Sequence, residues 1–398
     1  MTIEYDVIIT CNYSPWSRYS GGGQKSVHML AEAMARQGLK VAAVYSKAPW
    51  ERIAPHVKPL YHEHWAGYFA IRPGISSPLR FLNGILFYFK VRSLSTSRTI
   101  IHGNGDEASL FGLIRYKRKF VYTNRYPDFP GFLAGRDWTR LGTWFAILFR
   151  EPRFVAMAMG MRNAGNVTVT SGFSRIEVSK NFGLDPAALV IVPNGVDPIF
   201  LDSPMGKEER RGVLFFGRLT RAKGPDLALE AYALLPKDLR DVHPLRFLGA
   251  GPVKKELEQR AKALGLTQVE FPGWKTGDAL ALEIAGSRAV CLPSREESFG
   301  NSVVETLALG QPLISTRAGS IPEVSGPWAK LADLDDPAAL AKLLETELRG
   351  GLSWSDRCLQ REFVRDRYSW EQASLHYRNV YPPERLRIAH VGRSQLAE

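Results

Sequence analysis

The chain has 398 residues and a mass of 44.5 kDa, and 45% of its residues are hydrophobic, which suggests two globular domains. No run of about 18 uncharged apolar residues is present, so the sequence predicts no membrane-spanning helix. The first residues lack the pattern of a signal peptide, and the three cysteines, Cys11, Cys291 and Cys358, lie far apart. We therefore expect a cytoplasmic protein with reduced thiols, without a disulfide framework or a zinc site.

The positive charge is concentrated in the first half of the chain. The sequence contains 52 Lys and Arg against 40 Asp and Glu, a net charge of +12. Residues 1–200 hold 24 of the basic and 13 of the acidic residues, so the second half is nearly neutral. A basic half of this kind suits a nucleic acid, an anionic membrane surface or an acidic small substrate, and composition leaves all three open.

The first predicted elements are a strand, a helix and a second strand. The apolar run Tyr5–Thr10 predicts a buried strand, Gln24–Gln37 has the apolar spacing of a helix, and Val41–Tyr45 predicts the next strand. Parallel strands need a crossover connection, so this order indicates a parallel sheet.

The same alternation returns after a polar, linker-like stretch at Asp202–Arg211. The predicted elements, in chain order, are Gly212–Phe216, Lys223–Leu235, Leu245–Leu248, Ala289–Pro293, Asn301–Leu309 and Pro312–Thr316, with a helical tail from Trp354. We predict an α/β fold with two Rossmann-like α/β/α domains, residues 1–200 and 201–374, and a tail from about 375 to 398 that completes the first domain. Such domains bind ligands at the carboxyl ends of their strands, which would face a central cleft.

The most specific segment is residues 293–323, in which seven residues separate Glu297 from Glu305. Shorter blocks precede it: VPNGVD at 192–197, FGRLTRAKG at 216–224, GAG at 249–251 and FPG at 271–273. In this order and spacing, the blocks resemble the group 1, family 4-like retaining glycosyltransferases, which use nucleoside-diphosphate sugars and have the GT-B fold. The resemblance implies that the first domain binds the acceptor and the second domain binds the donor.

The donor diphosphate needs cations, and Arg218 and Lys223 directly follow a predicted strand. The resemblance gives both residues this role, whereas two solvated loop cations are the alternative. It also implies that Glu297 contacts the donor sugar and stabilises an oxocarbenium-like transition state, and that Glu305 holds the ribose hydroxyls. The other donor-binding residues that we predict are Gly251 and the residues that open a helix, Ser298, Phe299, Gly300 and Asn301.

Further candidates lie in the first domain. Gly22 and Gly23 precede a predicted helix and either let the backbone approach the donor or form only a mobile turn. His102 ends a predicted strand, where it lies either at the cleft or in the core as a satisfied histidine. Arg125 stands where the family has a histidine, and could bind an anionic sugar or an acceptor phosphate, or stabilise the leaving diphosphate. The candidate catalytic residues are therefore Glu297, Arg218, Lys223, Arg125 and His102.

The sequence shows no convincing metal site, and we expect no cofactor, because Arg218 and Lys223 can neutralise the diphosphate. The one cluster of potential metal ligands is His62, Glu63 and His64. Two histidines in this spacing lie on the same side of a strand, so a weak metal site and a solvated loop are the alternatives here.

Two short segments of the basic first domain mix aromatic and aliphatic residues between flanking cations: Phe81–Phe89 and Leu141–Phe149, with the cationic cluster Arg115–Lys119 between them. Both segments are too short to span a bilayer, so they are either buried helices or interfacial helices on an anionic membrane. The second alternative implies a lipid-linked or lipopolysaccharide-type acceptor at the inner face of the membrane. No nucleic-acid-binding module is recognisable, and we expect no nucleic acid as a partner.

The resemblance implies transfer of a sugar to a glycan or lipid-linked acceptor with retention of anomeric configuration, in the synthesis of cell-envelope polysaccharide or glycolipid. No nucleophilic carboxylate is identifiable, so we favour a front-face transfer in which the leaving diphosphate oxygen takes the acceptor proton. A sugar-nucleotide hydrolase and a non-catalytic sugar-nucleotide-binding protein of the same fold are the alternatives. The sequence leaves the nucleotide base, the sugar and the acceptor open.

Overall fold

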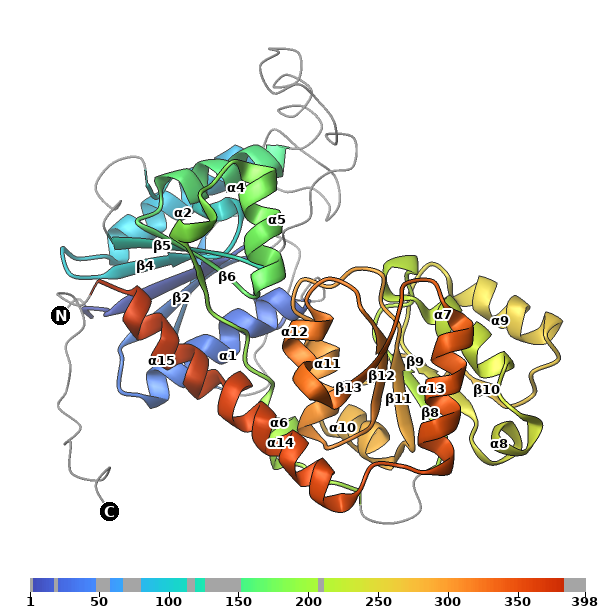
Figure 1. The fold of residues 1–398 in the computed structure, drawn as a ribbon. Helices are drawn as coiled ribbons and strands as arrows, with labels where there is room; N and C mark the ends of the chain where they lie inside the picture. The colour runs from blue at the N-terminus through green and yellow to red at the C-terminus, as the bar shows by residue number, and fades with distance from the viewer. Residues whose placement is uncertain are drawn as a thin grey trace, which may run out of the picture. The chain divides into compact units, whose positions relative to one another are not determined.

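The structure is a computed structural model that describes residues 3–17, 21–47, 58–66, 80–112, 119–125, 152–206 and 211–382. It contains two compact units: the first comprises residues 1–170, 174–195 and 370–398, and the second comprises residues 171–173 and 196–369. Apart from the short segment 171–173, the chain passes from one unit to the other at 195/196 and 369/370, whereas the boundaries predicted from the sequence are 200/201 and 374/375. Each unit is a parallel sheet with helices on both faces, which is the predicted α/β architecture (Figure 1).

The sheet of the first unit has seven strands in the order β3-β2-β1-β4-β5-β6-β7, and all neighbours are parallel. Strands β1 and β2 are buried along their whole length, which explains their continuous apolar runs in the sequence. The strand order reverses between β1 and β4, the place where sheets of this kind bind ligands. The strands are β1 Val7–Cys11, β2 Val41–Ser46, β3 His62–Ala66, β4 Ile100–Gly103, β5 Phe120–Asn124, β6 Asn166–Val169 and β7 Leu189–Ile191.

Two hydrophobic cores cover the two faces of this sheet, because successive side chains of a strand point to opposite sides. Ile8 packs with Phe87 of α2 in one core, whereas Ile9 packs with Leu30 of α1 and Tyr377 of α15 in the other. Helix α15, near the end of the described chain, therefore belongs to the first unit. The helices of this unit are α1 Gly22–Arg36, α2 Arg80–Leu94, η1 Asp106–Ala108, α4 Pro152–Asn163, α5 Gly172–Phe182, η4 Pro186–Ala188 and α15 Trp370–Val380.

Helix α1 begins at Gly22, earlier than the predicted start at Gln24. Glycine has a low helix propensity, which is why the pattern alone pointed to the later start. In the structure the Gln24 side chain accepts a hydrogen bond from the Gly21 backbone N–H at 2.9 Å and so supports the first turn.

The sheet of the second unit has six strands in the order β10-β9-β8-β11-β12-β13, again all parallel, and its order reverses between β8 and β11. The strands are β8 Val213–Phe216, β9 Leu245–Leu248, β10 Val269–Glu270, β11 Ala289–Leu292, β12 Leu313–Thr316 and β13 Ala329–Ala332. The helices are α6 Pro198–Asp202, η5 Arg221–Lys223, α7 Pro225–Ala233, α8 Lys237–Val242, α9 Lys254–Ala263, α10 Gly277–Gly286, α11 Asn301–Ala308, α12 Ile321–Ser325, η6 Gly326–Trp328, α13 Pro337–Arg349 and α14 Trp354–Tyr368.

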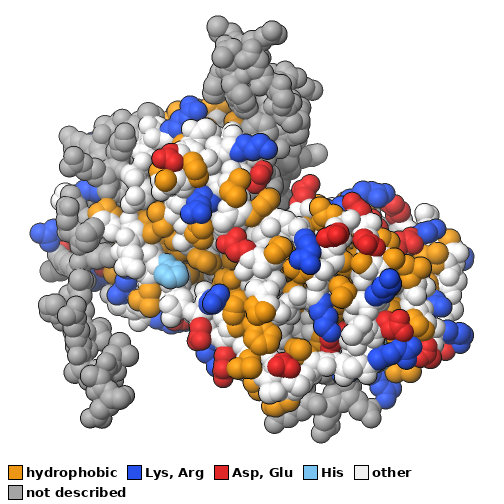
Figure 2. Space-filling view, viewed as in Figure 1, with side chains coloured by type: hydrophobic (Ala, Val, Ile, Leu, Met, Phe, Trp, Pro, Cys, Tyr) orange, Lys and Arg blue, Asp and Glu red, His pale blue; other side chains and the backbone are white. Residues whose placement is uncertain are grey.

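The surface of the second unit mixes acidic and basic side chains, as its balanced composition requires, and Figure 2 shows both interspersed on its visible face. Among the described residues, no helix combines the length and the apolar character needed to cross a membrane.

Candidate active site

The centre of the candidate donor site is an ion pair between Lys223 and Glu297, which follow β8 and β11, the two strands at the reversal of the sheet. Ser294 donates a further hydrogen bond to Glu297 Oε1 at 3.2 Å. The side chain of Glu297 is 7% exposed and that of Lys223 is 24% exposed, so the carboxylate is held firmly while the ammonium group keeps a route to solvent. Two residues that the sequence placed in one site are thus in direct contact.

Glycines let the loops of this site approach one another closely. Gly224 has a φ of 66°, and a Cβ at this position would lie 1.9 Å from the carbonyl oxygen of Pro293. Gly319 has a φ of 51°, and a Cβ there would lie 2.1 Å from the carbonyl oxygen of Glu297. Any larger residue at either position would displace the backbone next to Lys223 or Glu297.

Gly251 serves a similar packing purpose. A Cβ at Gly251 would lie 2.2 Å from the Leu219 carbonyl oxygen, and the Leu219 N–H donates to Ala250 O at 2.9 Å. The residue therefore fits the loop after β9 against the loop after β8, and its predicted contact with a donor stays a prediction.

Arg218 lies two residues after the end of β8 and is exposed. In the described part of the chain, no hydrogen bond or ion pair engages its side chain. Arg218 is therefore available to an anion at the same sheet edge as Lys223, and a guanidinium group can bind a phosphate through two N–H groups.

The predicted helix start is present, although one of its residues has a different role. Gly300, with a φ of 83°, immediately precedes α11, and Ser298, Asn301 and Glu305 are half-buried around the first turns. Phe299 is 3% exposed, and its ring packs edge-on against Tyr368 at 5.7 Å between centroids. The Phe299 ring is thus part of the core, and only its main chain is left to contact a donor.

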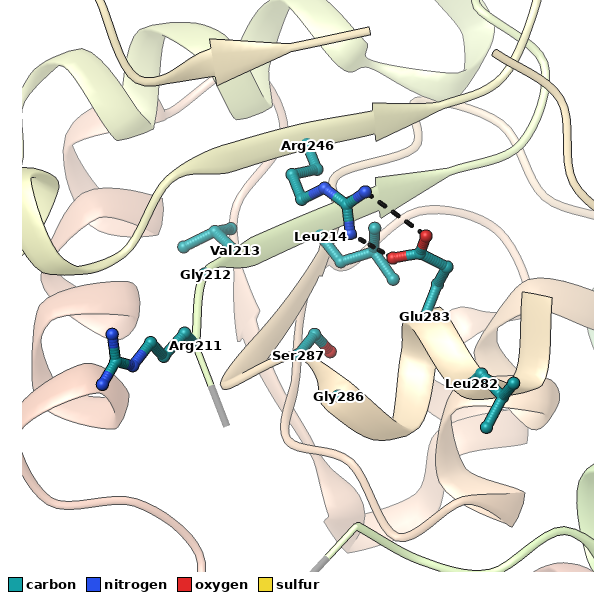
Figure 3. Close-up of a pocket in the computed structure, with 9 residues that line it drawn as sticks. All are labelled: Arg211, Gly212, Val213, Leu214, Arg246, Leu282, Glu283, Gly286 and Ser287. Atoms are coloured by element: carbon teal, nitrogen blue, oxygen red, sulfur yellow. Dashed lines mark hydrogen bonds and ion pairs between the residues drawn. The ribbon is translucent and has the colours of Figure 1, made fainter. Parts of the chain in front are cut away.

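The second unit also has a pocket at the opposite edge of its sheet, at the amino ends of β8 and β9 (Figure 3). Figure 3 shows Arg246 and Glu283 facing each other across it, joined by an ion pair. Glu270 also accepts from Arg246 Nε at 3.0 Å, and Lys275 pairs with Glu283. The charges of Arg246 and Glu283 are thus balanced by ion pairs, and none of the predicted site residues lines this pocket.

In the first unit, His102 lies at the end of β4 with no exposed surface. Its Nδ1 is 2.8 Å from the Tyr381 hydroxyl and its Nε2 is 2.6 Å from the Thr123 hydroxyl. Burial, and then the charge of Arg125, lowers the pKa of His102 to about 3, so the ring is neutral. Of the two alternatives, the structure shows the satisfied core histidine, and its partners leave no ring nitrogen for a substrate.

Arg125 directly follows β5 and is 6% exposed. Its Nε donates to Asn104 Oδ1 at 3.2 Å, and its Nη1 donates to Asn194 Oδ1. The guanidinium group thereby joins the loops that follow β4 and β7. Arg125 lies at the predicted sheet edge with hydrogen bonds to two amide oxygens, and its catalytic role stays a prediction.

Glu107 was missed by the sequence reasoning. It has no exposed surface, and its Oε1 accepts from Thr10 Oγ1 at 3.1 Å and from the Asn104 N–H at 3.2 Å. Its Oε2 has no hydrogen-bond partner among the described residues. Burial, and then the charge of Asp106, raises the pKa of Glu107 to about 7. The only sequence signal was its position just after a strand that ends at the reversal between β1 and β4.

The two histidines of the predicted metal cluster lie on strand β3 rather than on a loop. His62 Nδ1 and His64 Nε2 lie 3.0 Å and 2.9 Å from the same Tyr5 hydroxyl, whereas Glu63 accepts from Trp16 Nε1 at 3.1 Å. The two rings therefore share a side, as strand geometry requires, and converge on a phenol. No group of three or more His, Cys, Asp or Glu side chains in the described ranges is arranged to hold a metal.

The remaining candidates of the first unit are Gly22 and Gly23, which form the first turn of α1 after β1. Gly22 is exposed and Gly23 is half-buried. The backbone N–H groups of a first helical turn lack intrahelical partners, so both can donate to an anion. The predicted segment Leu141–Phe149 and most of the cluster Arg115–Lys119 lie outside the described residues.

Comparisons with known proteins agree with this architecture. Residues 20–200 match the family model described as Glycosyltransferase Family 4, and residues 202–355 match the model described as Glycosyl transferases group 1. An MMP alpha-(1->4)-mannosyltransferase from Mycolicibacterium hassiacum is 27% identical over 268 residues, which are 64% of this chain and 62% of that protein. The match thus spans less than two thirds of the length of this curated relative.

Two solved structures share the fold over nearly the whole chain. Sucrose-phosphate synthase from Thermosynechococcus elongatus has a TM-score of 0.72 at 19% identity, covering 94% of this chain and 97% of that one. HepE from Anabaena, solved in complex with UDP and glucose, has a TM-score of 0.69 at 18% identity, covering 95% of this chain and 99% of that one. Since the two family models together span most of the sequence, the chain belongs to the group 1 glycosyltransferases with the GT-B fold.

Proposed function

We propose that this protein transfers a sugar from a nucleoside-diphosphate sugar to a hydroxyl group of a glycan or lipid-linked acceptor, with retention of anomeric configuration. The observation that carries this proposal is the pairing of Lys223 with Glu297, beside the available Arg218, at the carboxyl edge of the second sheet. A diphosphate needs two or more positive charges and a preorganised site, and this edge offers both.

In the proposed step, the bond between the sugar anomeric carbon and the diphosphate oxygen breaks, and a bond to the acceptor oxygen forms on the same face. The acceptor proton moves to the leaving diphosphate oxygen, so no protein base is required. Arg218 and Lys223 stabilise the charge that develops on the diphosphate, and the Glu297 carboxylate stabilises the positive charge that develops on the sugar ring.

The ion pair has a consequence for donor binding. Without donor, Lys223 is bound to Glu297, and a bound diphosphate competes with this carboxylate for the same ammonium protons. Because lysine presents three donors on a flexible stem, it can keep Glu297 while it turns toward a phosphate. The exposed fraction of the Lys223 side chain leaves room for this movement.

Hexose chemistry is supported by two of the similar proteins. HepE was solved with UDP and glucose, and the mycolicibacterial relative is named a mannosyltransferase. We therefore propose a hexose nucleotide as the donor. The alternatives, hydrolysis of the donor or binding without turnover, are outcomes of the experiment described next.

The test is thermal unfolding with UDP, GDP, ADP, CDP and dTDP, beside the double variant Arg218→Ala/Lys223→Ala. A nucleotide at 100 times its Kd should add about 2.7 kcal/mol to the unfolding free energy of the native chain and nothing to the variant. Turnover of the matching sugar nucleotide, with and without acceptor, then separates transfer from hydrolysis. Absence of a shift with all five nucleotides would overturn the proposed donor class, and an inverted product anomer would overturn retention.

A membrane-bound acceptor is supported by helix α2. Its inner face carries Phe87 and Val91, which are fully buried, whereas Leu82, Ile85 and Phe89 on the opposite face are 39%, 39% and 62% exposed. The helix contains no acidic residue. An exposed apolar stripe on a basic helix is the pattern of interfacial helices, which bind anionic lipid surfaces.

We therefore propose that α2 contacts an anionic membrane and that the acceptor is lipid-linked. The protein should sediment with vesicles that contain anionic phospholipid and remain in solution with neutral vesicles at moderate salt. The variant Ile85→Ser/Phe89→Ser should lose this binding, whereas Ile176→Ser, at an equally exposed position of α5, should retain it. Equal binding to neutral and anionic vesicles would contradict the proposal.

A further inference from the structure

We propose that Arg295 is a positioning residue of the donor site, because it fastens the loop that carries Lys223 to the loop that carries Glu297. The inference rests on the proposed function, since it names what holds these two side chains in register. Arg295 lies between β11 and α11, inside the segment 293–323, and no role of its own was predicted for it from the sequence.

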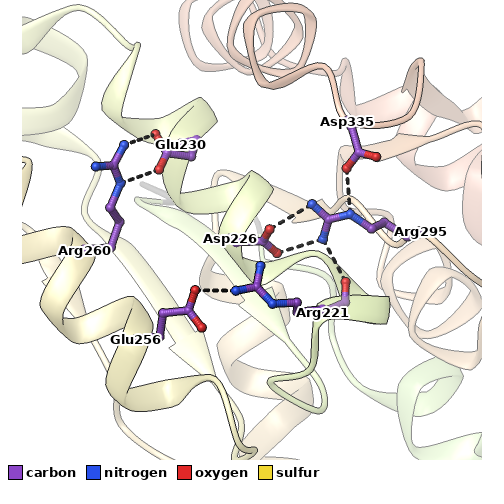
Figure 4. A network of polar contacts seen from close by, with 7 residues as sticks. All are labelled: Arg221, Asp226, Glu230, Glu256, Arg260, Arg295 and Asp335. Atoms are coloured by element: carbon purple, nitrogen blue, oxygen red, sulfur yellow. Dashed lines mark hydrogen bonds and ion pairs between the residues drawn. The ribbon is translucent and has the colours of Figure 1, made fainter.

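The Arg295 guanidinium group makes contacts in three directions (Figure 4). Its Nη1 and Nη2 donate to the two carboxylate oxygens of Asp226, in the first turn of α7, at 2.9 Å and 2.8 Å. Its Nε donates to Asp335 Oδ1 at 2.6 Å, and its Nη1 also donates to the Arg221 carbonyl oxygen at 2.8 Å. The paired bonds to Asp226 fix the plane of the guanidinium group as well as its position.

The main chain at Arg295 adds two further bonds to the same loop. The Arg295 N–H donates to the Ala222 carbonyl oxygen at 2.8 Å, and the Glu296 N–H donates to the same oxygen at 3.3 Å. The carbonyl groups of Arg221 and Ala222 belong to η5, which ends at Lys223. The bonds made by Arg295 therefore lie next to Lys223 on one loop and next to Glu297 on the other.

Asp335 extends this connection to a third loop, between β13 and α13. With a φ of 56°, it is the one residue other than glycine in the described ranges that has a positive φ. Aspartate tolerates this region better than most residues, but such a conformation persists only where the surroundings hold it. The short bond from Arg295 Nε supplies part of that restraint. Arg295 thus connects the loops that follow β8, β11 and β13 at the edge where the donor is expected.

The pKa shifts of Arg295 and Asp226 agree with an ion pair that persists across the working pH range. The hydrogen bonds to Asp226 raise the pKa of Arg295 above its ordinary value, despite partial burial. Burial acts to raise the pKa of Asp226, but the bonds from Arg295 outweigh it and lower that pKa. Both groups therefore stay charged throughout the range in which an enzyme would work.

A matched control lies in the same network. Arg260 makes a bidentate pair with Glu230, at 2.6 Å and 3.2 Å, and Figure 4 shows this pair beside the Arg295 contacts. It joins α9 to α7 and touches neither the Lys223 loop nor the Glu297 loop. The variant Arg260→Met therefore removes the same kind of interaction without disturbing the register of the donor residues.

The experiment compares Arg295→Met, Arg295→Lys and Arg260→Met with the native chain in the binding of the nucleoside diphosphate that stabilises the native chain most. We expect Arg295→Met to weaken nucleotide binding about tenfold and to raise the donor KM by a similar factor, because small displacements of binding groups have large effects. The acceptor KM should change less than twofold. Arg260→Met should bind as the native chain does, and Arg295→Lys should recover part of the affinity.

The outcomes separate the positioning role of Arg295 from the proposed function. Unchanged nucleotide affinity in Arg295→Met would overturn the positioning role and leave the proposed function intact. Equal losses of affinity in Arg295→Met and Arg260→Met would also overturn it, because the effect would then be one of general stability. Failure of the native chain to bind any nucleoside diphosphate would overturn the proposed function itself. If Arg295→Met does not fold, Asp335→Asn and Asp226→Asn replace it, and unchanged affinity in both would overturn the inference.

Discussion

The two sheets differ in how they expose the polar side chains at their carboxyl edges. In the second unit Arg218 is exposed and Lys223 keeps contact with solvent, whereas in the first unit His102 and Glu107 have no exposed surface. An exposed cation can exchange water for a ligand, whereas both ring nitrogens of His102 and one carboxylate oxygen of Glu107 are already hydrogen-bonded to protein groups. We therefore expect an anion to bind at the second unit, while these buried groups of the first unit connect its own strands and loops.

The largest effect is expected for Lys223→Met, which tests whether the solvent-accessible cations of the second unit bind the donor. The substitution removes a cation from the diphosphate and leaves the nearly buried Glu297 carboxylate without its partner. We expect kcat/KM to fall by about 10²–10³ and the unfolding free energy to fall by about 3 kcal/mol. The double variant Lys223→Met/Glu297→Gln should regain most of the stability but none of the activity, as measured by thermal unfolding and sugar transfer. Recovery of transfer in the double variant would show that the pair serves only the fold.

The pH dependence of the unfolding free energy, compared between the native chain and Glu107→Gln, tests the buried carboxyl group of the first unit. Burial raises the pKa of Glu107 from 4.5 to about 7, so the folded chain holds this proton more tightly than the unfolded chain. The stabilising contribution is complete below about pH 4.5 and is lost as the pH rises through 7, a change of about 3 kcal/mol. The Gln variant should lack this part of the pH dependence and bind nucleotide normally. Denaturant unfolding at about pH 5 and 8 measures the pH dependence of the unfolding free energy. Equal pH dependence in the native chain and in Glu107→Gln would contradict the raised pKa of Glu107.

Two arginine substitutions sharpen the comparison directly. Arg218→Met should weaken nucleotide binding by about 2 kcal/mol, because a charged hydrogen bond to phosphate is lost, and leave the unfolding free energy within about 0.5 kcal/mol.

Arg125→Met should lower the unfolding free energy and leave nucleotide affinity unchanged, since the buried amides of Asn104 and Asn194 lose a charged donor. Calorimetric binding and denaturant unfolding distinguish the two. A loss of nucleotide affinity in Arg125→Met without a loss of stability would place Arg125 in the substrate site instead.

The smallest expected effect concerns Tyr5→Phe. The change removes the hydroxyl on which His62 and His64 converge, at the amino end of the first sheet. We expect the unfolding free energy to fall by about 1 kcal/mol, the usual contribution of a hydrogen bond, with nucleotide affinity unchanged. A drop of several kcal/mol in denaturant unfolding would mean that this cluster supports the whole sheet.

Much of the fold could be predicted from the sequence because parallel strands covered on both faces are continuous apolar runs. The same reasoning placed Arg218 and Lys223 at a sheet edge, since both closely follow such a run, whereas the place of Glu297 in the site came from the family resemblance. Reasoning from such runs could not decide whether His102 is buried, because its partner Tyr381 is far along the chain and directly follows α15, the helix that returns to the first unit. The burial of Glu107 likewise arises from contacts with Thr10 and Asn104 that a local pattern does not contain.

Motif residues were predicted less well where a motif serves packing as well as binding. Phe299 stands among donor-site residues in the sequence, but its ring fills the core beside Tyr368. Gly251 stands in a loop associated with the donor, and its clearest requirement is the close approach of Leu219. A motif contains residues required for packing and residues required for ligand binding, and only the packed structure shows which residue serves which purpose.

The return of α15 to the first unit has a consequence for synthesis on the ribosome. Tyr377 and Tyr381 fill the core beside His102, so the first unit lacks part of its interior until the chain beyond residue 369 has emerged. Domains usually fold in the order of their synthesis. Here residues 196–369 form a complete core of their own. The half of the protein that is made second can thus finish folding before the half that is made first.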